Sequence, residues 1–275
     1  MTRLTKDGET FLGQENIAAM VDGYYDNLLG TPTQRAHTLN LDALDLPSLD
    51  LSHLELPFTA EEVERTVKSM PLDKAPGPDG FTGRLYASCW GIIKEDVMDA
   101  FRAFGRLDFQ GLTSMNQAFV TLLPKSPAAL EVRDFRTISL IHSFPKLVAK
   151  VMSLRVAPEM TNIVGTHQSA FIQGRCLHDN YMLVQGTVRW LQSTKRPALM
   201  LKLDITKAFD TADWAFLLEV LRHLGFGDKW IAWVAGLLAS SSTRVLLNGV
   251  PGKVIYNKCG FRQGDPLPPS SSSWS

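Results

Sequence analysis

The sequence lacks several features that would mark particular classes of protein. Its 275 residues contain no run of eighteen apolar residues, so no membrane-spanning helix is expected. Only three cysteines are present (Cys89, Cys176 and Cys259), and neither they nor the six histidines have zinc-like spacing. Such sparse cysteines are typical of reduced intracellular thiols and argue against both a disulfide framework and structural zinc.

The N-terminus lacks the apolar core of a signal peptide, because residues 1–10 are mostly polar and charged. We therefore expect an intracellular protein, in the cytoplasm or the nucleus, with no secretion signal and no transmembrane segment.

Net charge is also absent, since 28 Lys and Arg balance 28 Asp and Glu, which is unusual for a protein that binds nucleic acid. The charge is unevenly distributed. Residues 1–70 carry 5 basic and 12 acidic side chains, whereas residues 71–275 carry 23 basic and 16 acidic ones. A basic body behind an acidic segment can hold a phosphate backbone, but the same imbalance can exist without any partner.

Capping residues and apolar spacing predict a series of helices. Thr59 and Glu62 form a capping-box pattern that begins a helix ending near residue 70. Asp213 can cap a later helix that Gly225 ends. Further helices are expected at about residues 10–29, 82–104, 145–155, 179–193 and 228–239.

The strand predictions depend on alternation and turn signals. Residues 117–124 read as a strand closed by proline, and a hairpin is expected over 244–247 and 253–257. Residues 199–205 alternate between apolar and other side chains. We expect a strand whose leucines face the core, with Asp204 on the opposite face at its C-terminal end.

Residues 30–57 sustain neither a helical nor a strand period, and they are expected to form an irregular, exposed linker.

Asp204 is a candidate metal ligand. A carboxylate at a strand end, with the backbone carbonyl of Ile205, offers the hard oxygen ligands that Mg²⁺ prefers. In a two-metal site such ions clamp the attacking and leaving oxygens of phosphoryl transfer. Taken alone, an aspartate in this position is most often a cap or a solvated edge residue.

Two other groups of residues could bind a nucleotide. Lys125 and Arg136 stand at strand ends and could hold a triphosphate, although singly each reads as a solvated surface cation. Residues 260–267, Gly-Phe-Arg-Gln-Gly-Asp-Pro-Leu, place glycines around polar side chains, which suits a backbone packed under a base pair. The same segment alone could be an ordinary loop after a hairpin.

The order of the motifs is more specific than any one of them. They are Lys-Ala-Pro-Gly-Pro-Asp-Gly (74–80), Leu-Pro-Lys (123–125), Asp-Phe-Arg-Thr-Ile-Ser-Leu (134–140), His-Gln-Ser-Ala-Phe followed by Gly-Arg (167–175), the segment 204–210 and the segment 262–267. Over roughly residues 59–269 this series closely resembles the reverse transcriptase of LINE-type (non-LTR) retrotransposons. Within that family it looks most like plant elements.

The resemblance implies an α+β, helix-rich fold: the fingers and an incomplete palm of a right-hand polymerase. The implied division is an N-terminal extension and linker (1–58), a fingers region (59–198), a partial palm (199–269) and a disordered tail (270–275). It also implies RNA-templated DNA synthesis with an RNA template, a DNA primer, dNTPs and Mg²⁺, without a membrane or zinc.

Roles for individual residues follow from the same resemblance. Asp204, with the carbonyl of Ile205, matches the catalytic metal site, and Phe209 matches the aromatic residue that excludes a ribose 2′-OH. The implied nucleotide-binding residues are Lys125, Arg136, Phe209, Gln263 and Gly264. The implied nucleic-acid-binding residues are Gln168, Gly174, Arg175 and Arg262. The segment 74–80 matches a block to which we assign no role.

The chain also departs from the family pattern. Thr137 stands where proline is usual, Pro268 where serine is usual, and the pattern dissolves after Pro269. The aromatic-Ala-Asp-Asp motif that carries the remaining aspartates is absent from the 275 residues.

We therefore expect weak or absent Mg²⁺ binding and no catalysis. A frameshift or truncation of a retrotransposon copy, or a mispredicted gene model, would explain the serine-rich tail. The alternatives are a non-catalytic nucleic-acid-binding remnant and an unstable pseudogene product.

Overall fold

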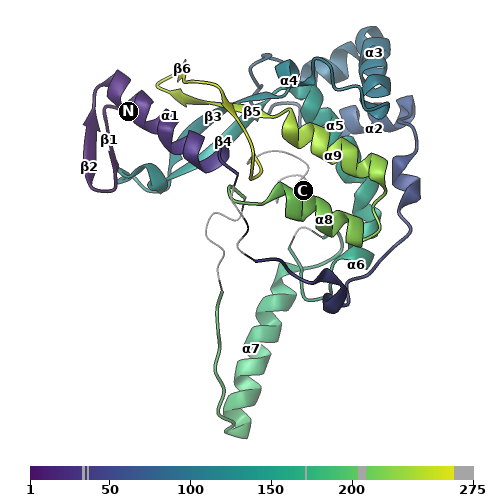
Figure 1. The fold of residues 1–275 in the computed structure, drawn as a ribbon. Helices are drawn as coiled ribbons and strands as arrows, with labels where there is room; N and C mark the ends of the chain where they lie inside the picture. Colours follow the sequence, from purple (N-terminus) through teal and green to yellow (C-terminus); the bar gives the residue numbers. More distant parts are fainter. Residues whose placement is uncertain (33–34, 36, 171, 204–208, 263–275) are drawn as a thin grey trace.

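The computed structural model describes residues 1–275 apart from 33–34, 36, 171, 204–208 and 263–275. An N-terminal hairpin and helix lie beside a mixed sheet, a group of helices lies at the other end of the sheet, and one long helix projects away (Figure 1). No helix in the described ranges is long and apolar enough to cross a bilayer. The predicted α+β, helix-rich fold is confirmed.

The sheet has the order β4-β3-β5-β6, with β7 also paired to β5. β3 (Gln117–Pro124) pairs antiparallel with β4 (Phe135–Ile141) and parallel with β5 (Ser242–Leu247). The short strands β6 (Val250–Pro251) and β7 (Ile255–Tyr256) pair antiparallel with β5. The predicted strand at 117–124 is confirmed, and so is the hairpin that follows residue 244.

The N-terminal segment is part of the sheet's core. β1 (Arg3–Lys6) and β2 (Glu9–Leu12) form a hairpin, and α1 (Gln14–Leu29) follows it. Their apolar side chains pack against one face of the sheet in a single cluster: Leu4, Ile17, Met20, Val21, Tyr25, Val120, Val132, Val245, Leu247 and Ile255. The helix predicted over 10–29 is confirmed, except that its first residues belong to β2.

Five helices share the second core. They are α2 (Ala60–Ser69), α3 (Gly83–Gly105), α5 (Ser143–Val156), α8 (Trp214–His223) and α9 (Asp228–Ala239). Aromatic rings are a third of its buried side chains, and Trp233 is completely buried between Phe58 and Phe104. The smaller elements are α4 (Leu112–Met115), α6 (Met160–Ile163), η1 (Leu41–Leu44), η2 (Ser52–Glu55), η3 (Val132–Asp134) and η4 (Ala157–Glu159).

The prediction of an exposed linker at 30–57 is wrong for its second half. Leu51 and Leu54 are almost fully buried in the helical core. The apolar residues there follow no regular period, so neither helical nor strand spacing could reveal which of them face inward.

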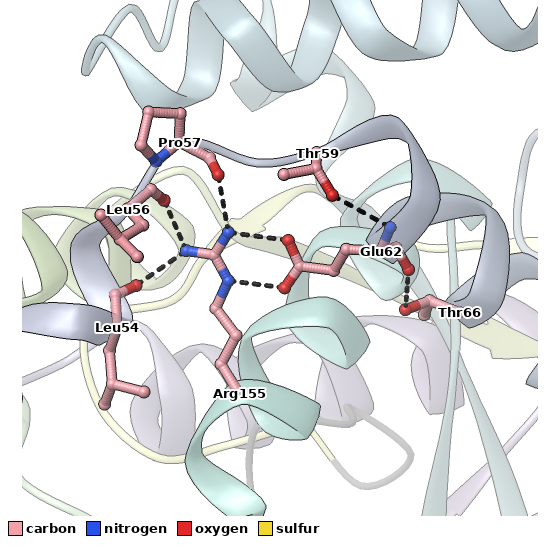
Figure 2. Close-up of polar contacts among 7 residues, drawn as sticks. All are labelled: Leu54, Leu56, Pro57, Thr59, Glu62, Thr66 and Arg155. Carbon is pink, nitrogen blue, oxygen red and sulfur yellow. Dashed lines mark hydrogen bonds and ion pairs between the residues drawn. The ribbon is translucent and has the colours of Figure 1, made fainter.

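Arg155, in α5, bonds both to the end of this segment and to α2 (Figure 2). Its guanidinium donates to the carbonyls of Leu54 (2.8 Å), Leu56 (2.7 Å) and Pro57 (3.1 Å). It also forms a two-point ion pair with Glu62, with N–O distances of 2.6 and 2.7 Å. Thr59 accepts a bond from the backbone N–H of Glu62 as predicted, while the Glu62 carboxylate binds Arg155.

The predicted strand at 199–205 is also wrong for residues 199–203, the part that the structure describes. Residues 199–203 have no strand geometry, and Leu201 and Leu203 are 77% and 80% exposed. Alternation produces a strand only when a neighbouring strand supplies hydrogen bonds, and none of the described strands pairs with this segment. The preceding helix α7 (Leu177–Thr194) is described in full, has no buried residue and projects from the body (Figure 1).

Candidate functional site

Two of the predicted motifs meet at their backbones. The N–H of Phe261 donates to the carbonyl of Phe209 (2.6 Å), and the N–H of Gly260 donates to Ala212 (2.8 Å). Trp214 donates its indole N–H to the Gly260 carbonyl (2.7 Å). The segment that ends the Asp204 motif therefore lies alongside the segment that begins the Gly-Phe-Arg motif.

Glycine is required at position 260. Its φ is +70°, and a Cβ there would lie 2.4 Å from the carbonyl oxygen of Asp210. Any side chain would therefore separate the two segments. Phe209, on the opposing segment, is 39% exposed.

The next helix starts directly after this contact. The Asp213 carboxylate accepts a bond from the N–H of Phe216 (2.6 Å), which confirms the predicted cap of α8. The cap and the Trp214 bond together fix the end of the Phe209 segment against α8.

Arg262 points inward to Asn116. Its guanidinium donates to the Asn116 carbonyl (2.9 Å) and to the Asn116 side-chain oxygen (2.6 Å). Arg262 was predicted to contact nucleic acid, and no role was predicted for Asn116. No sequence signal could reveal the pair, since the two residues are 146 positions apart and Asn116 belongs to no motif.

A small cavity of about 20 Å³ lies behind the junction, between α1 and the sheet. Thr243 Oγ1 and Asn257 Oδ1 are buried beside it without a hydrogen-bond partner among the described residues. Burial raises the pKa of the Tyr25 hydroxyl, and Tyr24 and Asp210 raise it further. Tyr25 therefore stays uncharged at neutral pH.

Arg136 lies in β4, and Lys125 follows directly after the end of β3. Arg136 is paired with Leu123, and the Lys125 N–H donates to the Asp134 carbonyl one step further along. Because side chains alternate along a strand, Arg136 points away from the face that carries Thr137, which lines the cavity. The structure thus brings the backbones of the two motifs together and keeps Arg136 off the cavity face.

Lys125 also has a local partner. Its ammonium donates to the Arg133 carbonyl at 2.6 Å, while the side chain stays exposed.

The loop with Gln168, Gly174 and Arg175 is organised by the arginine. Arg175 donates to four backbone carbonyls, those of Thr161, Val164, Gly165 and Gln168, at 2.6–3.3 Å. Gly174 has φ +81°, which permits the turn before Arg175. Gln168 is exposed and donates to the Ala170 carbonyl, and Gly174 is exposed as well, so both reach solvent.

The segment 74–80, to which sequence analysis assigned no role, docks onto the junction of β4 and α5. A Cβ on Gly77 would lie 2.2 Å from the Ile141 carbonyl oxygen. Asp79 accepts a bond from the N–H of Ser143 (2.6 Å) at the start of α5, and Ser143 donates to the Phe81 carbonyl (2.6 Å). The motif therefore has a structural role, because it holds the end of β4 and the start of α5.

His142 lies at the same junction. Burial lowers the pKa of its imidazole, Asp79 opposes that change, and Arg262 and Lys146 reinforce it.

Asp204, Ile205, Gln263 and Gly264 lie outside the described residues. In the remainder of the chain, no three His, Cys, Asp or Glu side chains come together as a metal site requires.

Comparison with known proteins identifies the family of this chain. The reverse transcriptase (RNA-dependent DNA polymerase) family matches residues 123–274, so the chain belongs to that family. It is 30% identical to the transposon TX1 uncharacterized 149 kDa protein of Xenopus laevis, over 78% of this chain and 16% of that protein.

Two further relatives come from retrotransposable elements. A Pol polyprotein of the type-1 element R2 of Nasonia vitripennis is 25% identical over 80% of this chain and 21% of that protein. A putative 115 kDa protein of the type-1 element R1DM of Drosophila melanogaster is 29% identical over 70% of this chain and 19% of that protein.

The chain spans about a fifth or less of these relatives' lengths. It is a reverse transcriptase domain of the non-LTR retrotransposon type.

Proposed function

We propose that the chain supplies nucleotide- and template-binding parts of an enzyme that copies RNA into DNA. The parent reaction is attack of a primer 3′-OH on a dNTP. The observation that carries the proposal is the backbone contact between Phe209 and Phe261, because it brings a sugar-facing and a base-facing motif together at one place. Such a reaction takes place inside the cell, in the cytoplasm or the nucleus.

The proposed roles follow the motifs. Phe209 excludes a ribose 2′-OH by occupying its space, and Lys125 and Arg136 attract the triphosphate as paired cations. Gln263 and Gly264 contact the nucleotide, and Gln168 and Gly174 contact the template or primer. Arg175 and Arg262 were expected to touch nucleic acid as well; their bonds to backbone carbonyls and to Asn116 support a role in shaping those contacts.

Mg²⁺ would be held by Asp204 and the Ile205 carbonyl, whose hard oxygens suit it. When bound, the metal stabilises negative charge on the transferred phosphoryl group. The 275 residues contain no aromatic-Ala-Asp-Asp series to complete the ligand set. We therefore propose that this polypeptide binds Mg²⁺ weakly and does not extend a primer by itself.

Primer extension tests this proposal. Purified chain, poly(rA)/oligo(dT), dTTP and Mg²⁺ should give no extended product, while the same primer–template is bound. Extension that Asp204→Ala abolishes would contradict the proposed inactivity. Failure to bind the primer–template at low salt would contradict the proposed function.

A non-catalytic nucleic-acid-binding protein is the second candidate. The excess of basic side chains in residues 71–275 favours it. A phosphate-binding surface predicts that the logarithm of the affinity falls linearly with the logarithm of salt concentration. Equal affinity for poly(rA) alone and for the primer–template would favour this candidate, since a polymerase fragment should prefer the primed duplex.

Two further expectations stay predictions: origin in a plant element, although the relatives reported above are animal, and a broken or truncated source element.

A further inference from the structure

Asn116 stands at the entrance of β3 and is 0% exposed. Its side-chain N–H₂ group donates to the Leu237 carbonyl (2.7 Å) and the Ser240 hydroxyl (2.8 Å) at the end of α9. Its side-chain oxygen and its carbonyl accept the two bonds from Arg262, and the carbonyl also accepts from the N–H of Ser242 (3.1 Å). The Asn116 side chain and carbonyl are thus both bonded, and they connect α9, β5 and Arg262.

The segment 260–262 carries this contact to Phe209. Arg262 is held on one end by Asn116, and one residue earlier the N–H of Phe261 is bonded to the Phe209 carbonyl. Gly260 extends the pairing to Ala212. Displacement of Arg262 would therefore move the backbone to which Phe209 is bonded.

We propose that Asn116 is a positioning residue for sugar selection: by holding Arg262, it fixes the segment 260–262 and so the place of Phe209. The proposal rests on the proposed function, in which Phe209 faces the sugar of the nucleotide. The two bonds to Arg262 are charge-assisted and two-pointed, which makes the contact directional as well as strong.

Steric exclusion depends on rigidity. A ring rejects a hydroxyl only if it cannot move aside, and a displacement of about 1 Å at a reacting site is enough to change function strongly. A deoxynucleotide has no atom in the excluded space. Loss of the Asn116 contact should therefore raise the affinity for a ribonucleotide while leaving the affinity for a deoxynucleotide nearly unchanged.

The experiment compares dUTP with UTP, which differ only at C2′. Dissociation constants are measured by calorimetry for the 275-residue chain bound to poly(rA)/oligo(dT). Asn116→Ala should reduce the preference for dUTP by about threefold or more, a range typical of residues that act through packed neighbours. Asn116→Ala removes the side-chain acceptor and keeps the backbone carbonyl, whereas Arg262→Ala removes both bonds, so its effect should be at least as large. The double variant should add little to Arg262→Ala, because the two changes act on the same contact.

Two variants separate positioning from general stability. Asn116→Asp keeps an acceptor for Arg262 but loses the donated bonds to α9, so it should retain the dUTP preference while unfolding more easily. Thr66→Val removes a buried hydroxyl that donates to the Glu62 carbonyl in α2 (2.9 Å). It should lower stability without changing the ratio of the two affinities, since partial unfolding reduces both equally.

Hydrogen–deuterium exchange gives a readout that needs no nucleotide. In Asn116→Ala, amides of residues 209–214 and 257–262 should exchange faster, while those of α2 do not change. An unchanged dUTP preference, or unchanged exchange in both segments, overturns the proposal. If the wild-type chain binds neither nucleotide, the proposed function fails, and exchange alone then decides whether Asn116 holds Phe209 in place.

Discussion

The helices α9 and α7 both carry Trp, Val and Leu side chains, which have opposite environments in the two helices. In α9, Trp230 and Trp233 are buried in the helical core, whereas Trp190 in α7 is 51% exposed. α7 is held mainly at its base, where Asn180 bonds to His167 and Ser169. The comparison teaches that an apolar pattern specifies a face, while burial depends on a partner that the pattern itself cannot supply.

The largest contrast is expected between two tryptophans. Trp233→Ala should cost about 3–5 kcal/mol in the free energy of unfolding, because it removes a buried ring and leaves a cavity. Trp190→Ala should stay within about 0.5 kcal/mol, as exposed substitutions do. Urea unfolding followed by far-UV circular dichroism measures both. Equal losses would show that α7 is packed in solution.

The Arg155 contact should come next. Arg155→Met leaves Glu62 and three carbonyls without their donor, and breaking such a pair costs about 3 kcal/mol where it is buried. The Arg155 side chain is only 11% exposed. The control is Arg84→Met, whose ion pair with Asp73 is exposed on both sides and should contribute at most about 1 kcal/mol. Similar losses in the two variants would mean that the contact in Figure 2 does not stabilise the helical core.

Helix caps offer a smaller contrast. Thr59→Ala removes the side-chain acceptor at the start of α2 and should lower stability by about 1 kcal/mol. α7 starts at Cys176 without a side-chain cap bond, so Cys176→Asp should slow amide exchange in its first turn. The unfolding midpoint should not change, because α7 lies outside both cores. A higher midpoint would show that α7 and the body unfold together.

The smallest effect concerns pH. Burial, Arg262 and Lys146 lower the pKa of His142 from its ordinary value of 6.5, against the opposing effect of Asp79. A lowered folded-state pKa contributes stability above the unfolded value, and that stability is lost as pH falls through the folded value.

Unfolding midpoints should therefore fall more between pH 7 and pH 5 in the wild type than in His142→Gln. His178→Gln, on exposed α7, is the matched control. Parallel profiles for the wild type and His142→Gln would contradict the prediction.

Local signals predicted the elements that form locally. The caps at Thr59 and Asp213 and the apolar spacing of 228–239 gave the correct helices, since a helix satisfies its own backbone bonds. The strand prediction for residues 199–203 was wrong because a strand also needs a neighbouring strand from elsewhere in the chain. The prediction that Leu51 and Leu54 are exposed was wrong because an irregular segment has no period that shows which side chains face the core.

The candidate site was likewise predictable in some of its features and not in others. The order of the motifs predicted the family and pointed to Phe209, Arg136 and Lys125. It could not show that Arg262 turns inward to Asn116, because that contact joins positions far apart in the chain. Nor could it place Arg136 on the face away from the cavity, which depends on the register of β3 and β4.

The parallel pairing of β3 with β5 has a consequence for biosynthesis. Ser242 follows its partner Gln117 by roughly 125 residues. At translation rates of about 5–20 residues per second, the β3–β4 hairpin leaves the ribosome roughly ten seconds before β5 can reach it. Throughout that interval the nascent chain presents an open strand edge, which makes it a natural client for chaperones that shield such edges.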